Sequence, residues 1–285
     1  MTTEAKQIIG IVGSGQMGRG IAQVGASSGY SVLLFDISEE ANKNALAFIT
    51  TQLNKGKEKG KWEQAFVDST LKNLKLTSKI NELKECDLVI EAATENLEIK
   101  LKIFQQLDEV TKPSCILASN TSSISITEIA ARTKRADKVA GMHFMNPVPV
   151  MKLVEGIKGL ETSDETFNYV KNVSEKMGKT FISVQDRPGF AVNRILMPMI
   201  NEAVYTLYEG VANAHDIDQA MKLGTNQPMG PLELADFIGL DTCLAIMNVL
   251  YDGFSDSKYR PCPLLKQYVK ANRLGRKNGK GFYKY

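Results

Sequence analysis

The sequence predicts an α/β fold: a doubly wound, mostly parallel β-sheet with helices on both faces, followed by an all-helical domain. Three observations support this prediction. Short apolar runs alternate with helical segments up to about residue 184, as in the crossover units of a parallel sheet. A glycine-rich turn directly follows the first apolar run. After residue 188, Leu, Met, Ile and Ala recur at helical spacing, and no comparable strand pattern follows.

Strands are expected in the first domain where apolar runs are too short to form helices. These runs are residues 7–12, 31–35, 88–91, 115–118, 139–142 and 180–184. Helical patterns occupy residues 17–28 and residues 39 to about 53.

Polar residues, Pro and Gly follow one another at residues 185–189, which is typical of a linker. We therefore expect a first domain at residues 1–187 and a helical second domain at residues 188–285. Helical spacing is clearest at residues 190–209 and 232–250, and Pro198 should kink the first of these helices. The abundant Met and Leu there indicate a core or a subunit interface.

Residues 13–18 read Gly-Ser-Gly-Gln-Met-Gly, a G-x-G-x-x-G motif between a strand and a helix. Gly13 would permit the tight turn, Gly15 the approach of a diphosphate, and Gly18 the close packing of the helix. The anion would sit on the N–H groups at the positive end of this helix, around Gln16 and Met17. The motif therefore predicts a Rossmann-type nucleotide-binding domain.

Asp36 closes the second predicted strand, where this fold uses an acid to accept hydrogen bonds from the adenosine ribose. Because a carboxylate there repels a 2′-phosphate, we expect NAD rather than NADP as the cofactor. The alternative is that Asp36 only caps the next helix.

Residues 91–96 follow the apolar strand residues 88–90 and should line the same groove, because ligands bind beyond the carboxyl ends of such strands. Glu95 and Lys100 could equally form a solvated pair at a helix start. The sequence pattern leaves both interpretations open.

The chain has two histidines, and their settings differ. His215 lies in a polar segment that resembles a helix start, which indicates a solvated, structural residue. His143 follows the strand at residues 139–142, where active-site groups gather in this fold. An imidazole there suits proton transfer near neutral pH. Glu155 could hold the ring if the chain returns it there, which spacing alone cannot prove.

Composition excludes several classes of partner. The net charge is +3, so no general attraction to nucleic acid is expected. The four cysteines form no CxxC pair, which indicates reduced thiols. No apolar run approaches the roughly 20 residues that span a bilayer, and no secretory signal pattern is visible. We expect a cytoplasmic protein, or a mitochondrial matrix protein whose leader has been removed, with no membrane partner and no bound metal.

Residues 141–155 read GMHFMNPVPVMKLVE, and residues 118–123, 186–194 and 279–283 read ASNTSS, DRPGFAVNR and GKGFY. In order and spacing these motifs resemble the L-3-hydroxyacyl-CoA dehydrogenase family over essentially the whole chain. The resemblance implies an NAD-dependent oxidoreductase that interconverts (S)-3-hydroxyacyl-CoA and 3-oxoacyl-CoA. The length is similar to that of short-chain members, which act on 3-hydroxybutyryl-CoA and acetoacetyl-CoA.

The resemblance also implies roles for individual residues. His143 matches the general acid/base and Glu155 the carboxylate that orients it. Ser122 matches the hydroxyl that bonds the reacting oxygen, and Asn193 the amide that contacts the substrate from the second domain. On pattern alone, Ser122 could be the N-cap of a helix at residues 124–131, and Asn193 a helix cap or a partner in an interdomain hydrogen bond. The residues that match cofactor-groove positions are Glu95, Lys100, Asn120 and Asn146.

A dense basic run at residues 55–61 follows a predicted helix. Such a run is usually a solvated turn, but it can also pair with the phosphates of CoA. In the family resembled, a helical insertion grips CoA with lysines, and Lys55 and Lys59 align with them. The family also implies a homodimer formed through the helical domain.

Two rival functions stay open at this point. A binding or structural protein can keep the fold and the NAD site while lacking turnover, since fold does not imply activity. A dehydrogenase of a small sugar-type hydroxy acid would use a similar nucleotide site.

Overall fold

The computed structural model describes residues 6–285 of the chain. These residues divide into two compact units, with the division between Asp186 and Arg187. The sequence places the boundary one residue later, after Arg187.

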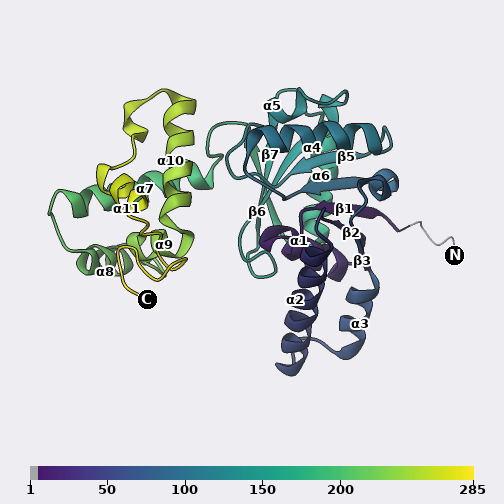
Figure 1. The fold of residues 1–285 in the computed structure, drawn as a ribbon, viewed down its shortest axis with the longest axis horizontal. Helices are drawn as coiled ribbons and strands as arrows, with labels where there is room; N and C mark the ends of the chain where they lie inside the picture. Colours follow the sequence, from purple (N-terminus) through teal and green to yellow (C-terminus); the bar gives the residue numbers. More distant parts are fainter. Residues whose placement is uncertain (1–5) are drawn as a thin grey trace. The chain divides into compact units, whose positions relative to one another are not determined.

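The first unit is built on one sheet, which has eight strands within the described residues in the order β3-β2-β1-β4-β5-β6-β7-β8 (Figure 1). Neighbouring strands are parallel except β6 and β7, which are antiparallel. The doubly wound, mostly parallel sheet predicted from the sequence is therefore confirmed. The strands are β1 (Ile8–Val12), β2 (Ser31–Phe35), β3 (Leu74–Thr77), β4 (Leu88–Glu91), β5 (Ile116–Ser119), β6 (Val139–Phe144), β7 (Leu153–Lys158) and β8 (Thr180–Gln185).

Two strands, β3 and β7, are not predicted by the sequence analysis. β3 is a four-residue edge strand whose sequence, Leu-Lys-Leu-Thr, contains one exposed lysine. β7 carries Glu155, Gly156 and Lys158, so its apolar content is low although its central residues are buried. Polar residues and short length thus make both strands hard to predict from hydrophobicity.

Helices pack against the sheet along its length: α1 contacts β1 and β2, and α6 contacts β6, β7 and β8. Buried aliphatic side chains of the strands and helices form a continuous core, including Ile9, Ile21 and Leu34. The helices of this unit are α1 (Gln16–Ser27), α2 (Glu39–Glu58), α3 (Gln64–Lys72), α4 (Leu97–Val110), α5 (Ile126–Ala130) and α6 (Asp164–Lys176). Short 3-10 turns lie at Ile80–Glu85 and Ala136–Lys138.

Helix α2 is longer than the sequence pattern indicates, and it runs away from the sheet with α3 beside it (Figure 1). Its last turn contains Lys55, so the expectation that the basic run wholly follows the helix is wrong. Trp62 explains the extension, because its Nε1 donates to the Leu53 carbonyl over 2.8 Å. Gly56 makes room for the indole: a Cβ there would lie 2.1 Å from the Trp62 ring. This pair of helices is the helical insertion that the family resemblance implies.

The second unit, described in full, consists of helices around their own apolar core. The predicted helix at residues 232–250 is in fact two, because Gly239 between them adopts a φ of +104°. Pro198 lies within α7, as the sequence indicates. The helices are α7 (Val192–Tyr208), α8 (Ala214–Gly224), α9 (Pro231–Ile238), α10 (Leu240–Phe254) and α11 (Pro263–Lys270), with a 3-10 turn at Ser257–Tyr259.

Among residues 6–285, no single helix is long and apolar enough to cross a bilayer. The pair α9 and α10 reaches that length and composition only together, and it bends by 99° at the junction. All four cysteines are within the described part of the chain, and each is a buried, free thiol, as predicted.

Candidate functional site

The strand order reverses between β1 and β4, so the chain winds to opposite sides of the sheet from this point. In open α/β sheets, the crevice outside the carboxyl ends of the strands at such a point binds ligands. A cavity of about 270 Å³ lies there. It is lined by the start of α1 and by the loops after β4 and β5, through Gly15, Gln16, Met17, Ala92, Ala93, Thr94, Glu95, Lys100, Asn120 and Thr121.

The glycine turn has the geometry that lets a diphosphate come close to the backbone. Gly13 adopts a φ of +100°, and a Cβ there would lie 2.7 Å from the Ala93 Cα. A Cβ on Gly18 would lie 1.7 Å from the Gly13 carbonyl oxygen, so only glycine allows α1 to start this close to β1. Above Gly15, by contrast, there is open space, and no side chain caps the helix. The N–H groups at the start of α1 therefore face room for an anion.

Asp36 stands at the end of β2 beside this turn. Its two carboxylate oxygens accept hydrogen bonds from the backbone N–H of Ser14 over 2.8 Å and of Ser38 over 3.0 Å. Ser38, not Asp36, caps α2, so the capping interpretation of Asp36 is wrong. The open space at Gly15, the uncapped helix and this carboxylate fit the diphosphate and ribose of a dinucleotide.

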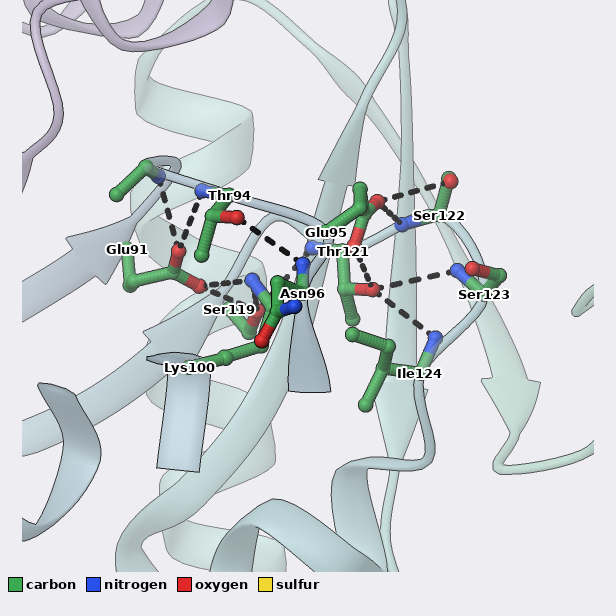
Figure 2. Close-up of polar contacts among 11 residues, drawn as sticks. Glu91, Thr94, Glu95, Asn96, Lys100, Ser119, Thr121, Ser122, Ser123 and Ile124 are labelled. Atoms are coloured by element: carbon green, nitrogen blue, oxygen red, sulfur yellow. Dashed lines mark hydrogen bonds and ion pairs between the residues drawn. The ribbon is translucent and has the colours of Figure 1, made fainter. Parts of the chain in front are cut away.

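A buried acid, Glu91, stands at the end of β4. The sequence analysis places it in the segment expected to line the groove, but Glu91 is not among the residues that line the cavity, so that expectation is wrong for this residue. Its carboxylate forms an ion pair with Lys100, and both side chains are almost wholly buried (Figure 2). The alternative of a solvated Glu95–Lys100 pair is therefore wrong. A charged residue that closes an otherwise apolar strand is the signal that could have identified Glu91, because a buried carboxylate needs a partner.

Glu95 instead binds the loop that follows β5 (Figure 2). Its carboxylate accepts hydrogen bonds from the Thr121 hydroxyl over 2.8 Å, the Ser122 N–H over 2.7 Å and the Ser122 hydroxyl over 2.9 Å. The cap of α5 is Ser125, so the interpretation of Ser122 as that cap is wrong. Ser122 is thus held at the carboxyl edge of the sheet by an acid from the neighbouring loop.

His143 lies within β6, and the antiparallel pairing of β6 with β7 places Glu155 directly opposite. The ring Nδ1 lies 2.8 Å from Glu155 Oε2. The Glu155 side chain is fully buried, and the histidine side chain is 10% exposed. An ionised carboxylate only accepts, so Nδ1 carries the proton and Nε2 is left with a lone pair in the neutral ring.

Two asparagines tie this region to the nucleotide cavity. The Asn120 side-chain oxygen accepts from the Phe144 N–H over 2.9 Å, which links the loop after β5 to the strand that carries His143. The exposed Asn146 side-chain oxygen accepts from the Gln16 amide over 3.0 Å, which links the loop after β6 to the start of α1.

The remaining predicted residues lie on other helices. Lys55 and Lys59 are exposed at the end of α2, one turn apart. Asn193 is a buried residue in the first turn of α7 in the second unit, and Ala191 rather than Asn193 is the cap. His215 is exposed in α8, as predicted. Among residues 6–285, no cluster of three His, Cys, Asp or Glu side chains has metal-binding geometry.

Comparisons with known proteins identify one family along the whole chain. The family model "3-hydroxyacyl-CoA dehydrogenase, NAD binding domain" matches residues 8–187, and the C-terminal domain model of the same family matches residues 189–285. The chain is 56% identical to a probable 3-hydroxybutyryl-CoA dehydrogenase of Bacillus subtilis, covering 99% of this chain and 98% of the relative. It is 42% identical to the human mitochondrial hydroxyacyl-coenzyme A dehydrogenase, covering 100% and 94%.

Solved structures give the same result. The crystal structure of an (S)-3-hydroxybutyryl-CoA dehydrogenase from Ralstonia eutropha superposes with a TM-score of 0.96. The two sequences are 52% identical, and the match covers 99% of each chain.

Proposed function

The chain belongs to the 3-hydroxyacyl-CoA dehydrogenase family, and we propose that it acts on the four-carbon pair (S)-3-hydroxybutyryl-CoA and acetoacetyl-CoA, with His143 as the general acid/base. The family makes it an NAD-dependent oxidoreductase that interconverts 3-hydroxyacyl-CoA and 3-oxoacyl-CoA. The proposal adds the substrate length and the residues that carry the chemistry.

The observation that carries this proposal is the His143–Glu155 pair near the carboxyl edge of the sheet. In the oxidative direction, His143 Nε2 takes the proton from the substrate 3-hydroxyl, and Glu155 stabilises the imidazolium that forms. NAD, when bound, accepts the hydride. In the reductive direction, His143 returns the proton to the 3-oxo group. Ser122 hydrogen-bonds the reacting oxygen, and Asn193 positions the acyl group.

The cofactor site is proposed to use the glycine turn and four polar side chains of the groove. Gly13, Gly15 and Gly18 shape the turn, and the N–H groups of Gln16 and Met17 face the diphosphate. Asp36 accepts from the ribose and disfavours a 2′-phosphate. The groove residues are Glu95, Lys100, Asn120 and Asn146, of which the first three line the cavity.

We also propose that Lys55 and Lys59 bind the CoA phosphates. Both ammonium groups are exposed at the far end of α2, and Lys59 lies one turn after Lys55, so both lie on one face. CoA carries a diphosphate and a 3′-phosphate, and two adjacent cations suit that charge.

A homodimer through the second unit is the proposed assembly. Large apolar side chains on that unit are exposed, including Ile195 at 73%, Val211 at 72% and Leu223 at 83%. A subunit interface would remove them from water. Sedimentation equilibrium of the purified protein tests this assembly: a single species of twice the chain mass supports it, and a monomer contradicts it.

The experiment that tests the proposed function follows NADH consumption with acetoacetyl-CoA and, separately, with free acetoacetate. The proposal predicts turnover with the thioester and none with the free acid. NADH binding without turnover of either compound would indicate a catalytically silent relative. Turnover of small free hydroxy acids, with indifference to CoA, would favour a sugar-acid dehydrogenase.

A further inference from the structure

The Glu91 carboxylate holds together two loops that are far apart in the sequence. It accepts hydrogen bonds from the backbone N–H groups of Ala93 over 2.9 Å and Thr94 over 3.4 Å, which belong to the loop after β4. It also accepts from the Ser119 hydroxyl over 2.9 Å, at the end of the neighbouring strand β5. Figure 2 shows these contacts converging on one carboxylate, with the Lys100 ammonium beside it.

Ser119 continues this network into the second loop. Its hydroxyl oxygen accepts from Lys100 Nζ over 3.3 Å and from the Thr121 N–H over 3.2 Å. The network defined by Glu91, Lys100 and Ser119, here called the Glu91 cluster, therefore fixes the start of the loop after β5 as well as the loop after β4. Both loops line the nucleotide cavity.

Stability alone is a weak reason for such a cluster. Removing two charges from water is costly, and an apolar pair of similar volume is often as stable as a buried ion pair or more so. The exposed fractions of the Lys100 and Glu91 side chains are 1% and 0%, so the full desolvation cost applies. An apolar pair, however, could not accept hydrogen bonds from the two loop N–H groups, and it could not orient the Ser119 hydroxyl.

We propose that Glu91 is a positioning residue for NAD: its carboxylate fixes both loops of the cavity wall, and through them the placement of Glu95. This inference rests on the cavity being the cofactor site, as described under the proposed function. Glu91 is fully buried and is not among the residues that line the cavity. It acts through the loops that it holds.

The test uses Glu91→Gln, which keeps the size of the side chain but removes its charge. Losing charge-assisted hydrogen bonds to the loops should weaken NADH binding about tenfold. The KM for NADH should rise in parallel, while kcat at saturating NADH changes much less. Amide hydrogen exchange should become faster in residues 92–94 and at Thr121, which measures loop order without reference to turnover.

A matched control removes a comparably buried ion pair elsewhere. Asp108 pairs with Arg135 over 2.7 Å, with side chains 6% and 10% exposed, and neither residue lines the cavity. Asp108→Asn should lower thermal stability but leave NADH affinity unchanged. If Glu91→Gln behaves in the same way, with lower stability and wild-type NADH affinity, then Glu91 is only structural and the inference is wrong.

Ser119→Ala is the second variant, and it keeps the Glu91–Lys100 ion pair intact. It should speed exchange at Thr121 while leaving residues 92–94 protected, and it should weaken NADH binding less than Glu91→Gln does. This variant decides the question if Glu91→Gln fails to fold: unchanged NADH affinity in a folded Ser119→Ala protein contradicts the inference. Failure of the wild-type protein to bind NADH would instead overturn the proposed function of the cavity.

Discussion

The proton-transfer role proposed for His143 depends on its contact with Glu155. Glu155 is fully buried, so its carboxylate needs a donor, and the ring Nδ1 lies 2.8 Å away. This hydrogen bond fixes the tautomer and the direction of the ring, which leaves Nε2 as the atom that can take a proton. Because the fold already holds the imidazole in this orientation, the ring does not have to reorient during the reaction.

We propose that Asp36 selects NAD over NADP. Both of its oxygens are held by backbone N–H groups, which fixes a negative charge at the end of β2. Replacing it by serine, Asp36→Ser, removes the acceptor for the ribose and the repulsion of a 2′-phosphate. The ratio of kcat/KM for NADH to that for NADPH should therefore fall by about tenfold or more.

Steady-state kinetics with both nucleotides measure this ratio. Asp252→Ser serves as the control, because it removes an exposed aspartate in α10, in the second unit. An unchanged ratio in Asp36→Ser would show that the carboxylate does not select the nucleotide.

At the scale of the elements, the helices α2 and α3 extend away from the sheet and carry lysine side chains at their far end (Figure 1). Lys57 donates to Gln64 over 2.7 Å and is thereby engaged within the helix pair. Lys55 and Lys59 are exposed at the end of α2. Exposed cations at this distance from the core contribute little to folding, so their substitution should affect binding rather than stability.

The double substitution Lys55→Ala with Lys59→Ala should raise the KM for acetoacetyl-CoA about tenfold at low ionic strength, since two phosphate contacts are lost. The effect should shrink as salt screens the remaining charges. Kinetics over a salt series measure both. Lys171→Ala, on α6, removes an exposed lysine elsewhere and should have no effect. A KM that stays at the wild-type value at every salt concentration would contradict the CoA role.

Sequence patterns predict the elements of the site better than its contacts. The glycine motif and Asp36 are identifiable because each follows an apolar strand, and His143 because it comes at the carboxyl end of one, within β6. The partnership of Glu155 was left open, because it depends on the antiparallel register of a strand, β7, whose polar residues hide it. The partners of Glu91 cannot be predicted from the sequence, because they come from three segments that only the folded sheet brings together.

For the molecule as a whole, the reactivity of the four cysteine thiols measures whether the apolar cores of both units are closed to solvent. Burial raises the pKa of Cys86 to about 12 and of Cys115 to about 11 in the first unit. Burial likewise raises the pKa of Cys243 to about 12 and raises that of Cys262 in the second unit. The thiolate is the reactive form, so these side chains are protonated and inert near neutral pH in the folded protein.

A thiol reagent that forms a coloured product should therefore react slowly with the native protein at about pH 8. In guanidinium chloride it should titrate all four cysteines at once. The time course of absorbance distinguishes the two states. Rapid reaction of a thiol in the native protein, at a rate independent of denaturant, would show that at least one core is open.

The central claim is that His143 performs the proton transfer, and one pair of measurements tests it most directly: turnover of acetoacetyl-CoA and the NADH dissociation constant of His143→Ala. The account predicts a kcat lower by about 10²- to 10⁴-fold with NADH affinity unchanged, while His215→Ala, the exposed histidine of α8, stays at wild-type activity. Wild-type turnover in His143→Ala would contradict the account.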